Sequence, residues 1–196
     1  MNSFLTNTSE ITFLNQIKDN LKRCDSFVFS VSFIKKAGLV LLYKELESAI
    51  QRGCKGKLIT STYQNFTDIE SLQLFLNLAN TYDNFECHLD DACFMSEAYE
   101  TKGFHSKGYV FTYGEDVDII VGSSNITRFA LLKNIEWDLL MKDTIHGCLY
   151  QEVMHEFNYL WDKTNVLTSD GIQKYARKLN YAIERWDMDY DVIQSE

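Results

Sequence analysis

The 196-residue sequence contains no proline, and this absence excludes a proline-rich linker between domains. Its apolar runs all fall short of the roughly 20 residues of a membrane-spanning helix, so we expect a soluble protein with no membrane partner. The first ten residues, MNSFLTNTSE, have neither the basic start nor the apolar centre of a signal peptide. This pattern favours the cytoplasm.

Positive charge is also scarce. Lysine and arginine number 19 against 28 acidic residues, which gives a formal net charge of -9 at pH 7. A negative surplus repels the phosphate backbone and counts against broad electrostatic binding of nucleic acid. Any such binding therefore requires a local basic groove or a partner that supplies the affinity.

Apolar residues make up 45% of the chain, which excludes a disordered protein. The length suits one domain, or one domain with a helical appendage. The cysteines are odd in number and scattered, which favours reduced thiols over a disulfide framework. They are Cys24, Cys54, Cys87, Cys93 and Cys148.

The spacing of apolar residues changes repeatedly between the period of a helix and the alternation of a strand. Helices are expected at residues 9–23, 36–52, 68–79, 126–132, 145–163 and 169–186. Strands are expected at residues 26–33, 56–61, 85–89, 104–112, 117–121 and 136–142. The first strand, helix, strand unit favours parallel pairing with a right-handed crossover, and the turn at 113–116 favours an antiparallel hairpin. We therefore predict an α/β fold, a mixed β-sheet flanked by helices on both faces.

A histidine and a lysine are two residues apart in the expected strand at 104–112. Because side chains alternate along a strand, His105 and Lys107 should point to the same face. The next strand is followed by the run Gly122-Ser123-Ser124-Asn125, which opens a helix. The free N–H groups at such a turn bind anions. If the two strands pair as a hairpin, these pieces suit one bound phosphodiester.

The segment from Phe104 to Trp137 resembles the HKD motif of the phospholipase D superfamily, in which His-x-Lys is followed by Gly-Ser-x-Asn. The resemblance extends from Ser26 to Lys142 and implies a phospholipase D-like fold. It implies a nuclease-like domain at residues 1–165 and a C-terminal helix with an acidic linker at 166–196. The runs GFHSKGYVF, GSSNIT and NIEWD are most similar to single-motif domains fused to superfamily 2 helicases, so a fused helicase is an implied partner.

The resemblance implies four catalytic residues, His105, Lys107, Asn125 and Glu136. It implies phosphate binding by Gly122, Ser123 and Ser124. His105 would take the phosphoryl group as a phosphohistidine, while Lys107 and Asn125 hold the non-bridging oxygens. Glu136 would accept a hydrogen bond from the imidazole and fix its tautomer. Such a site uses no metal and no other cofactor.

The implied mechanism uses a second histidine to protonate the leaving oxygen, whereas this chain holds one His-x-Lys arrangement. We therefore expect a homodimer. The chain departs from the family pattern at Thr112, where the pattern has aspartate.

Two weaker patterns stand outside the motif. The run Thr60, Ser61, Thr62 and Tyr63 ends an expected strand, where open sheets bind ligands, so these residues are candidates for contact with DNA. An ordinary polar loop explains them equally well. Cys87, His88 and Cys93 match no zinc-site spacing, and we expect no metal site there.

The function that the sequence favours is a metal-independent phosphodiesterase, an endonuclease acting on DNA as a homodimer. Two alternatives remain open. The chain could be a non-cleaving nucleic-acid-binding or assembly module of a helicase, which the Thr112 departure favours. It could also be a phospholipid hydrolase or transferase, although no amphipathic membrane-binding segment is evident.

Overall fold

The computed structural model describes residues 2–91 and 103–180. Its strands are β1 (Ser3–Leu5), β2 (Ser26–Val31), β3 (Lys55–Ser61), β4 (Phe85–Asp90), β5 (Lys107–Tyr113), β6 (Asp116–Gly122), β7 (Asp138–Thr144) and β8 (Asn165–Val166). Its helices are α1 (Phe13–Leu21), α2 (Lys36–Leu39), α3 (Tyr43–Gln51), α4 (Ile69–Thr81), α6 (Arg128–Leu132) and α7 (Cys148–Trp161), with a 3-10 turn at Tyr63–Asn65. Residues 169–180 are also helical. The expected end of this last helix, the acidic linker and Cys93 lie outside the described residues.

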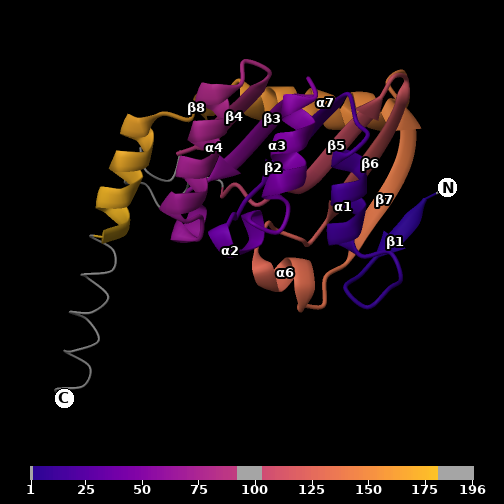
Figure 1. The fold of residues 1–196 in the computed structure, drawn as a ribbon, viewed down its shortest axis with the longest axis horizontal. Coiled ribbons are helices and arrows are strands. Elements are labelled where there is room, and N and C mark those ends of the chain that lie inside the picture. The colour runs from indigo at the N-terminus through magenta and orange to yellow at the C-terminus, as the bar shows by residue number, and fades with distance from the viewer. Residues whose placement is uncertain (1, 92–102, 181–196) are drawn as a thin grey trace.

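The strands form one mixed sheet in the order β1-β7-β6-β5-β2-β3-β4-β8. Strands β2, β3 and β4 are parallel, and β5, β6 and β7 form an antiparallel meander beside β2. Figure 1 shows α1, α3 and α4 in front of the sheet and α7 behind it. The expected α/β fold with helices on both faces is therefore confirmed.

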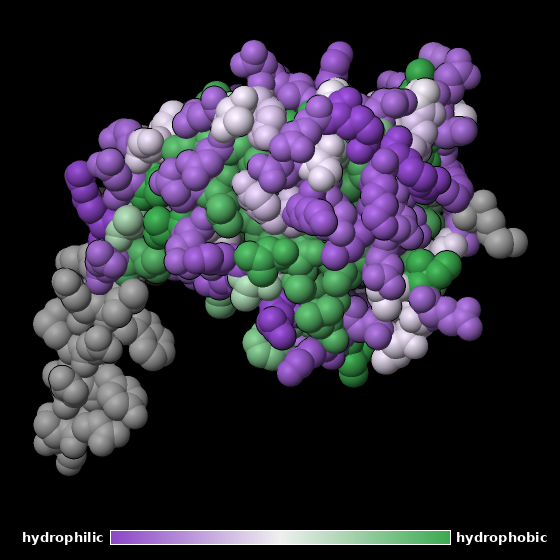
Figure 2. Space-filling view, in the orientation of Figure 1, coloured by the Kyte–Doolittle hydropathy of each residue, from purple (hydrophilic) through white to green (hydrophobic). Residues whose placement is uncertain are grey.

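The two faces of the sheet bury different cores. In β2, Phe27 and Phe29 point into the larger core under α1, α3 and α4, while Val28 points to the smaller cores under α7. Tyr175, from the C-terminal helix, is fully buried in the larger core and donates a hydrogen bond to the Thr67 carbonyl at 2.7 Å. Figure 2 shows apolar surface around α2 and α6, where Val40, Phe129 and Leu132 are exposed.

No helix in the described ranges has both the length and the apolarity to cross a bilayer.

Several element boundaries differ from those expected. The first helix begins at Phe13 rather than residue 9, because the hydroxyl of Thr12 caps it by accepting the Asn15 N–H at 3.2 Å. The two edge strands β1 and β8 were not expected from the sequence. They have three and two residues, too few for alternation to show, and their extended conformation depends on pairing with β7 and β4.

The helix expected at 36–52 is instead two helices, α2 and α3. The first is docked against the turn that follows β6. The N–H of Lys35 donates to the Ile126 carbonyl at 2.9 Å, and a Cβ on Gly38 would overlap the backbone of Ile126 and Thr127. This close approach fixes the backbone immediately after Asn125.

Gly122 allows β6 to approach the start of β7. A Cβ at this position would overlap Asp138 Oδ1 and the Trp137 carbonyl oxygen. We expect Gly122→Ala to lower the free energy of unfolding by about 1–3 kcal/mol, measured by urea denaturation, because the strands must separate. The control is Gly108→Ala in β5, where a Cβ meets no atom within 4 Å. Equal losses in the two variants would contradict this account.

Candidate active site

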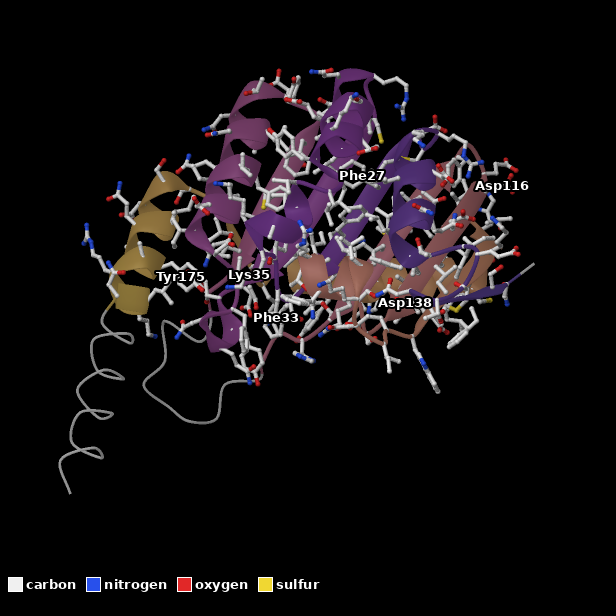
Figure 3. The ribbon with its side chains drawn as sticks, turned by 60° about the horizontal axis from the view of Figure 1, so that its bottom comes forward. Phe27, Phe33, Lys35, Asp116, Asp138 and Tyr175 are labelled. Atoms are coloured by element: carbon white, nitrogen blue, oxygen red, sulfur yellow. The ribbon has the colours of Figure 1, made fainter. Side chains whose placement is uncertain are left out.

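The candidate site lies at one edge of the sheet, where β2 and β6 end and β5 and β7 begin. Val31, the last residue of β2, pairs with Lys107, the first residue of β5. Gly122, the last residue of β6, pairs with Asp138, the first residue of β7. Since β5 and β6 pair along their length, the His-x-Lys segment and the Gly-Ser turn meet at this edge. Figure 3 brings the edge forward and labels Asp138 there.

His105 and Lys107 lie on the same side of the chain, although His105 precedes β5 rather than lying within it. The Lys107 ammonium donates to the His105 carbonyl at 2.9 Å and lies 3.1 Å from His105 Nδ1. It also lies 3.5 Å from the hydroxyl of Ser32. Lys107 is buried and His105 is exposed. The imidazole can therefore meet a ligand from solvent while the ammonium lies beneath it.

The surroundings of this pair favour a neutral imidazole. Partial burial lowers the pKa of His105, and the Lys107 ammonium lowers it further. Burial also lowers the pKa of Lys107, an effect that the Glu136 carboxylate partly offsets. A neutral imidazole with an unshared electron pair is the form that attacks phosphorus.

Asn125 is held with its amide donor available. Its Oδ1 accepts the Phe33 N–H at 3.1 Å, which fixes the side chain between the end of β2 and the turn after β6. Within the described residues its Nδ2 makes no hydrogen bond, and the side chain is half-buried. This NH₂ group is therefore able to donate to a bound oxygen.

Ser123 and Glu136 form a second pair at the site. The Ser123 hydroxyl donates to Glu136 Oε2 and accepts the Trp137 N–H at 3.1 Å. The other carboxylate oxygen accepts from Asn134 Nδ2 at 3.2 Å. In the described chain Glu136 thus bonds Ser123 and Asn134 and not His105, whose Nδ1 faces Lys107.

Ser124 is placed differently from its neighbours. It is fully buried. Its hydroxyl donates to Asp138 Oδ2 at 2.6 Å, its N–H donates to Asp138 Oδ1 at 3.1 Å, and its carbonyl accepts from the Tyr109 hydroxyl at 2.7 Å. Its polar groups therefore hold the turn in place and are not presented to solvent. Gly122 likewise contributes close packing against β7.

The run Thr60 to Tyr63, at the end of β3, contributes only its last residue to the surface of the site. Thr60 and Ser61 are fully buried, and Thr62 is nearly so. The hydroxyls of Ser61 and Thr62 donate hydrogen bonds to the carbonyl oxygens of Ser32 and Asp90. Tyr63 is half-buried, and its ring lies edge-on to His105 at 6.2 Å between centroids. Of the four residues, Tyr63 is the one that the structure brings to the histidine.

Sequence reasoning missed three residues at this edge, Ser32, Phe33 and Asp138. Phe33 follows β2, and its ring lies 5.4 Å from the His105 ring. Asp138 stands two residues after Glu136, so strand alternation was the signal that would have placed both carboxylates on one face. Ser32 and Phe33 had no such signal, because their partners come from distant parts of the sequence.

The described part of the chain contains no group of three histidine, cysteine or acidic side chains that could hold a metal ion. His88 stacks on Trp161 at 3.6 Å between centroids, and its Nδ1 lies 3.2 Å from the Thr164 hydroxyl. Its partners are those of a structural histidine.

Thr112 lies at the opposite end of β5 from Lys107. Five residues along a strand span about 17 Å, and the Thr112 hydroxyl lies 2.5 Å from that of Ser26. Thr112, the residue that departs from the family pattern, is therefore remote from His105. This distance weakens the case that the departure indicates a non-cleaving module.

The sequence matches the family described as "Cardiolipin synthase, PLD-like domain" over residues 14–161. The chain belongs to the phospholipase D superfamily. None of the curated proteins compared matches the sequence.

Solved structures with this phospholipase D fold include Nuc, a phospholipase D family member from Salmonella typhimurium. It is 16% identical, with 86% of this chain and 99% of Nuc covered and a TM-score of 0.64. Phosphatidylserine synthase from Haemophilus influenzae Rd KW20 is 16% identical, with 98% of this chain and 46% of the synthase covered and a TM-score of 0.59. TrmBL2, an archaeal chromatin protein described with a novel mode of DNA binding, is 17% identical, with 84% of this chain and 53% of TrmBL2 covered and a TM-score of 0.52.

Proposed function

We propose that this protein is a metal-independent phosphodiesterase that cleaves DNA as a homodimer through a phosphohistidine intermediate. The observation that carries the proposal is the placement of the buried Lys107 ammonium beneath an exposed imidazole of lowered pKa, 3.1 Å from its Nδ1. The free amide of Asn125 adds a neutral donor at the same edge. Attack, charge neutralisation and hydrogen bonding to one phosphate are thus available from the chain itself.

The steps follow from these positions. A phosphate oxygen is a stronger acceptor than the imidazole, so a bound phosphodiester draws the Lys107 ammonium away from His105. A nitrogen of His105 then attacks phosphorus, a P–N bond forms, and the P–O bond to the leaving group breaks. The leaving oxygen takes a proton from the matching histidine of a second copy. Water next cleaves the P–N bond and gives its proton back to that histidine.

A second copy has a suitable surface on which to dock. Apolar side chains beside the site are exposed, with Ile135 at 92%, Trp137 at 67%, and Val121 and Leu139 at 45% each. They flank the catalytic segment at the ends of β6 and β7. Grouped apolar exposure of this kind is typical of protein interfaces, and docking there would bring two histidines together.

Because the net charge is -9, the single domain has little long-range attraction for DNA. The association with a superfamily 2 helicase that the sequence resemblance implies would supply affinity for the strand, and we retain it as part of the proposal.

The test is cleavage of single-stranded and plasmid DNA in EDTA together with the solution mass. We expect cleavage without a divalent cation and a mass twice the 22.8 kDa of one chain. Leu139→Glu should yield a monomer with little activity, since burying a charge opposes docking. The matched control is Val166→Glu, because Val166 is 64% exposed on β8 at the opposite end of the sheet. A monomer that cleaves at the wild-type rate, or cleavage that requires added Mg²⁺, would contradict the mechanism.

A second candidate is a phospholipid phosphodiesterase. An apolar groove of about 500 Å³ runs between the sheet and α7 and reaches His105, with Val110, Leu149, Val153 and Leu160 in its walls. A groove of this size accepts an apolar chain. Release of headgroup from phospholipid vesicles, with no cleavage of DNA, would favour this candidate over the nuclease.

A further inference from the structure

Two aromatic side chains flank the imidazole of His105, and a third packs on one of them. The Phe33 ring lies edge-on to the His105 ring, with centroids 5.4 Å apart and planes at 69°. The Tyr63 ring is also edge-on, at 6.2 Å and 78°. Phe33 and Tyr63 are nearly parallel to each other, with planes at 13°, and Phe66 packs on Phe33 at 5.0 Å. The faces of Phe33 and Tyr63 therefore share one orientation beside the attacking group, whereas the Phe66 ring is tilted by 56° from that of Phe33.

These rings are not part of the hydrophobic core. None of the three is buried, and Phe66 is 48% exposed. The buried residues of the larger core come from the sheet and from the helices in front of it. Core packing thus does not explain why three aromatic residues lie at a solvent-facing edge.

The backbone around the rings is held in a sparsely populated conformation. Gln64 and Asn65 have φ of 55° and 58°, values that cost residues other than glycine free energy. The turn is kept by hydrogen bonds from Tyr63 N–H to the Ser61 hydroxyl at 3.1 Å and from Asn65 N–H to the Thr62 carbonyl at 3.0 Å. A strained turn that presents a tyrosine and a phenylalanine to the site is characteristic of a ligand-binding segment.

Phe33 is also connected to the phosphate-binding groups. Its N–H donates to Asn125 Oδ1, and the Lys107 ammonium lies 5.5 Å from its ring centroid. A nucleotide whose phosphate contacts Lys107 and Asn125 would therefore place its base within reach of these rings. Tyr63 is packed against the backbone of Gly103, where a Cβ would overlap its ring.

We propose that Phe33, Tyr63 and Phe66 form a base-stacking site, and that the substrate is a nucleic-acid strand whose bases are unpaired beside the scissile phosphate. In a duplex the faces of the bases stack on one another and are not available to a protein ring. Base stacking on aromatic residues does not require surplus positive charge, which this chain lacks, and contributes roughly 5- to 150-fold in affinity per base. The proposal rests on the proposed function and names the substrate class of that site.

The test is a binding measurement in EDTA, by fluorescence anisotropy, with labelled oligothymidylate on the His105→Ala background so that cleavage does not interfere. We expect Phe66→Ala to weaken binding roughly tenfold, whereas Phe66→Tyr, which keeps the ring, stays within about twofold of the parent. The matched control is Phe129→Ala, because Phe129 is 61% exposed on α6 and its ring faces the Lys133 ammonium at 5.8 Å. This control should bind as the parent does.

Further substrates separate stacking from backbone contact. An abasic oligonucleotide of equal length should bind roughly tenfold more weakly than the intact strand, and Phe66→Ala should then cause no further loss. A blunt duplex should also bind more weakly, and oligouridylate reveals whether the unpaired strand is DNA or RNA. Equal losses for the intact and abasic strands, or duplex binding as tight as single-strand binding, would overturn the proposal. So would binding to phospholipid vesicles in place of oligonucleotides.

The outcomes also separate this proposal from the phosphodiesterase function. Ring-dependent binding without any cleavage by the wild type supports the stacking site and contradicts the catalytic function. Cleavage of single strands and duplexes at equal rates, unchanged in Phe66→Ala, supports the catalytic function and contradicts the stacking site.

Discussion

Replacement of His105 by alanine should reduce phosphodiester cleavage by at least about 10³-fold, since the variant loses the proposed nucleophile and with it the two-step route. The free energy of unfolding should change little, because the imidazole is exposed and substitutions at exposed positions usually cost under about 0.5 kcal/mol. The measurement is single-turnover cleavage of labelled single-stranded DNA in EDTA, with urea denaturation of the same samples. A variant that loses activity and stability together would not support the assignment.

The matched control is His155→Ala. His155 is an exposed histidine on α7, so its removal takes away the same side chain from a position outside the site. This variant should cleave at the wild-type rate. Substantial cleavage by His105→Ala would exclude the phosphohistidine mechanism.

The dependence of cleavage on pH provides a second measurement on the same residue. Burial and the adjacent Lys107 ammonium lower the pKa of His105 below its ordinary value, so the attacking neutral form persists into mildly acidic solution. The single-turnover rate should fall as the pH drops through this lowered pKa, because the nucleophile is then protonated. It should also fall at higher pH, because the matching histidine of the second copy no longer holds the proton that the leaving oxygen takes. A loss of rate on the acidic side of the profile that already begins above about pH 7 would show that the imidazole is not shielded from protonation as the geometry requires.

The central features of the site could be predicted because they are encoded locally. Strand alternation placed His105 and Lys107 on one side, and the two residues of the β5–β6 turn, with Gly114 at a φ of 59°, return the chain so that Gly122 reaches the same edge. Hairpins connect neighbours in sequence, so their pairing follows from spacing alone.

The aromatic residues could not be predicted in the same way. Phe33, Tyr63 and Phe66 follow two parallel strands whose carboxyl ends meet only after the crossover helices have folded. The contact of Phe33 and Tyr63 with His105 depends on the sheet order β5-β2-β3, which no local spacing specifies. The hydroxyls of Ser61 and Thr62, which donate to backbone carbonyls, show the converse, because polar residues at a strand end can serve buried backbone groups instead of a ligand.

The break between α2 and α3 has a similar tertiary origin. Helical periodicity continues across residues 36–52, yet α2 ends at Leu39 where Gly38 packs against the backbone of Ile126. The contact partner is nearly 90 residues away in the sequence, so propensity alone favoured one continuous helix.

Asp138 should be the residue on which the stability of the catalytic turn depends most. Replacing it with alanine leaves the hydroxyl and the N–H of fully buried Ser124 without an acceptor. Each unsatisfied buried group costs about 1–3 kcal/mol, so we expect Asp138→Ala to lower the free energy of unfolding by about 2–5 kcal/mol in urea denaturation. Because the turn also carries Asn125, cleavage should fall in the molecules that remain folded.

The matched control for this carboxylate is Asp116→Ala. Asp116 is the exposed first residue of β6, and Figure 3 shows it far from Asp138. Its replacement should change the free energy of unfolding by less than about 0.5 kcal/mol. Similar losses in the two aspartate variants would contradict a specific role for the Ser124 hydrogen bonds.

The variant Asp138→Asn retains an acceptor and tests the charge separately. Burial raises the pKa of Asp138 above its ordinary value, an effect that the Ser124 hydrogen bonds partly offset. A carboxyl whose pKa is higher in the folded state takes up its proton preferentially there, so its stabilising contribution is complete below the unfolded pKa and is lost as the pH rises through the folded one. The stability of the wild type relative to Asp138→Asn should therefore increase as the pH is lowered from about 7 to about 4. A difference that stays constant or decreases over this range would show that burial does not penalise the charged form at this position.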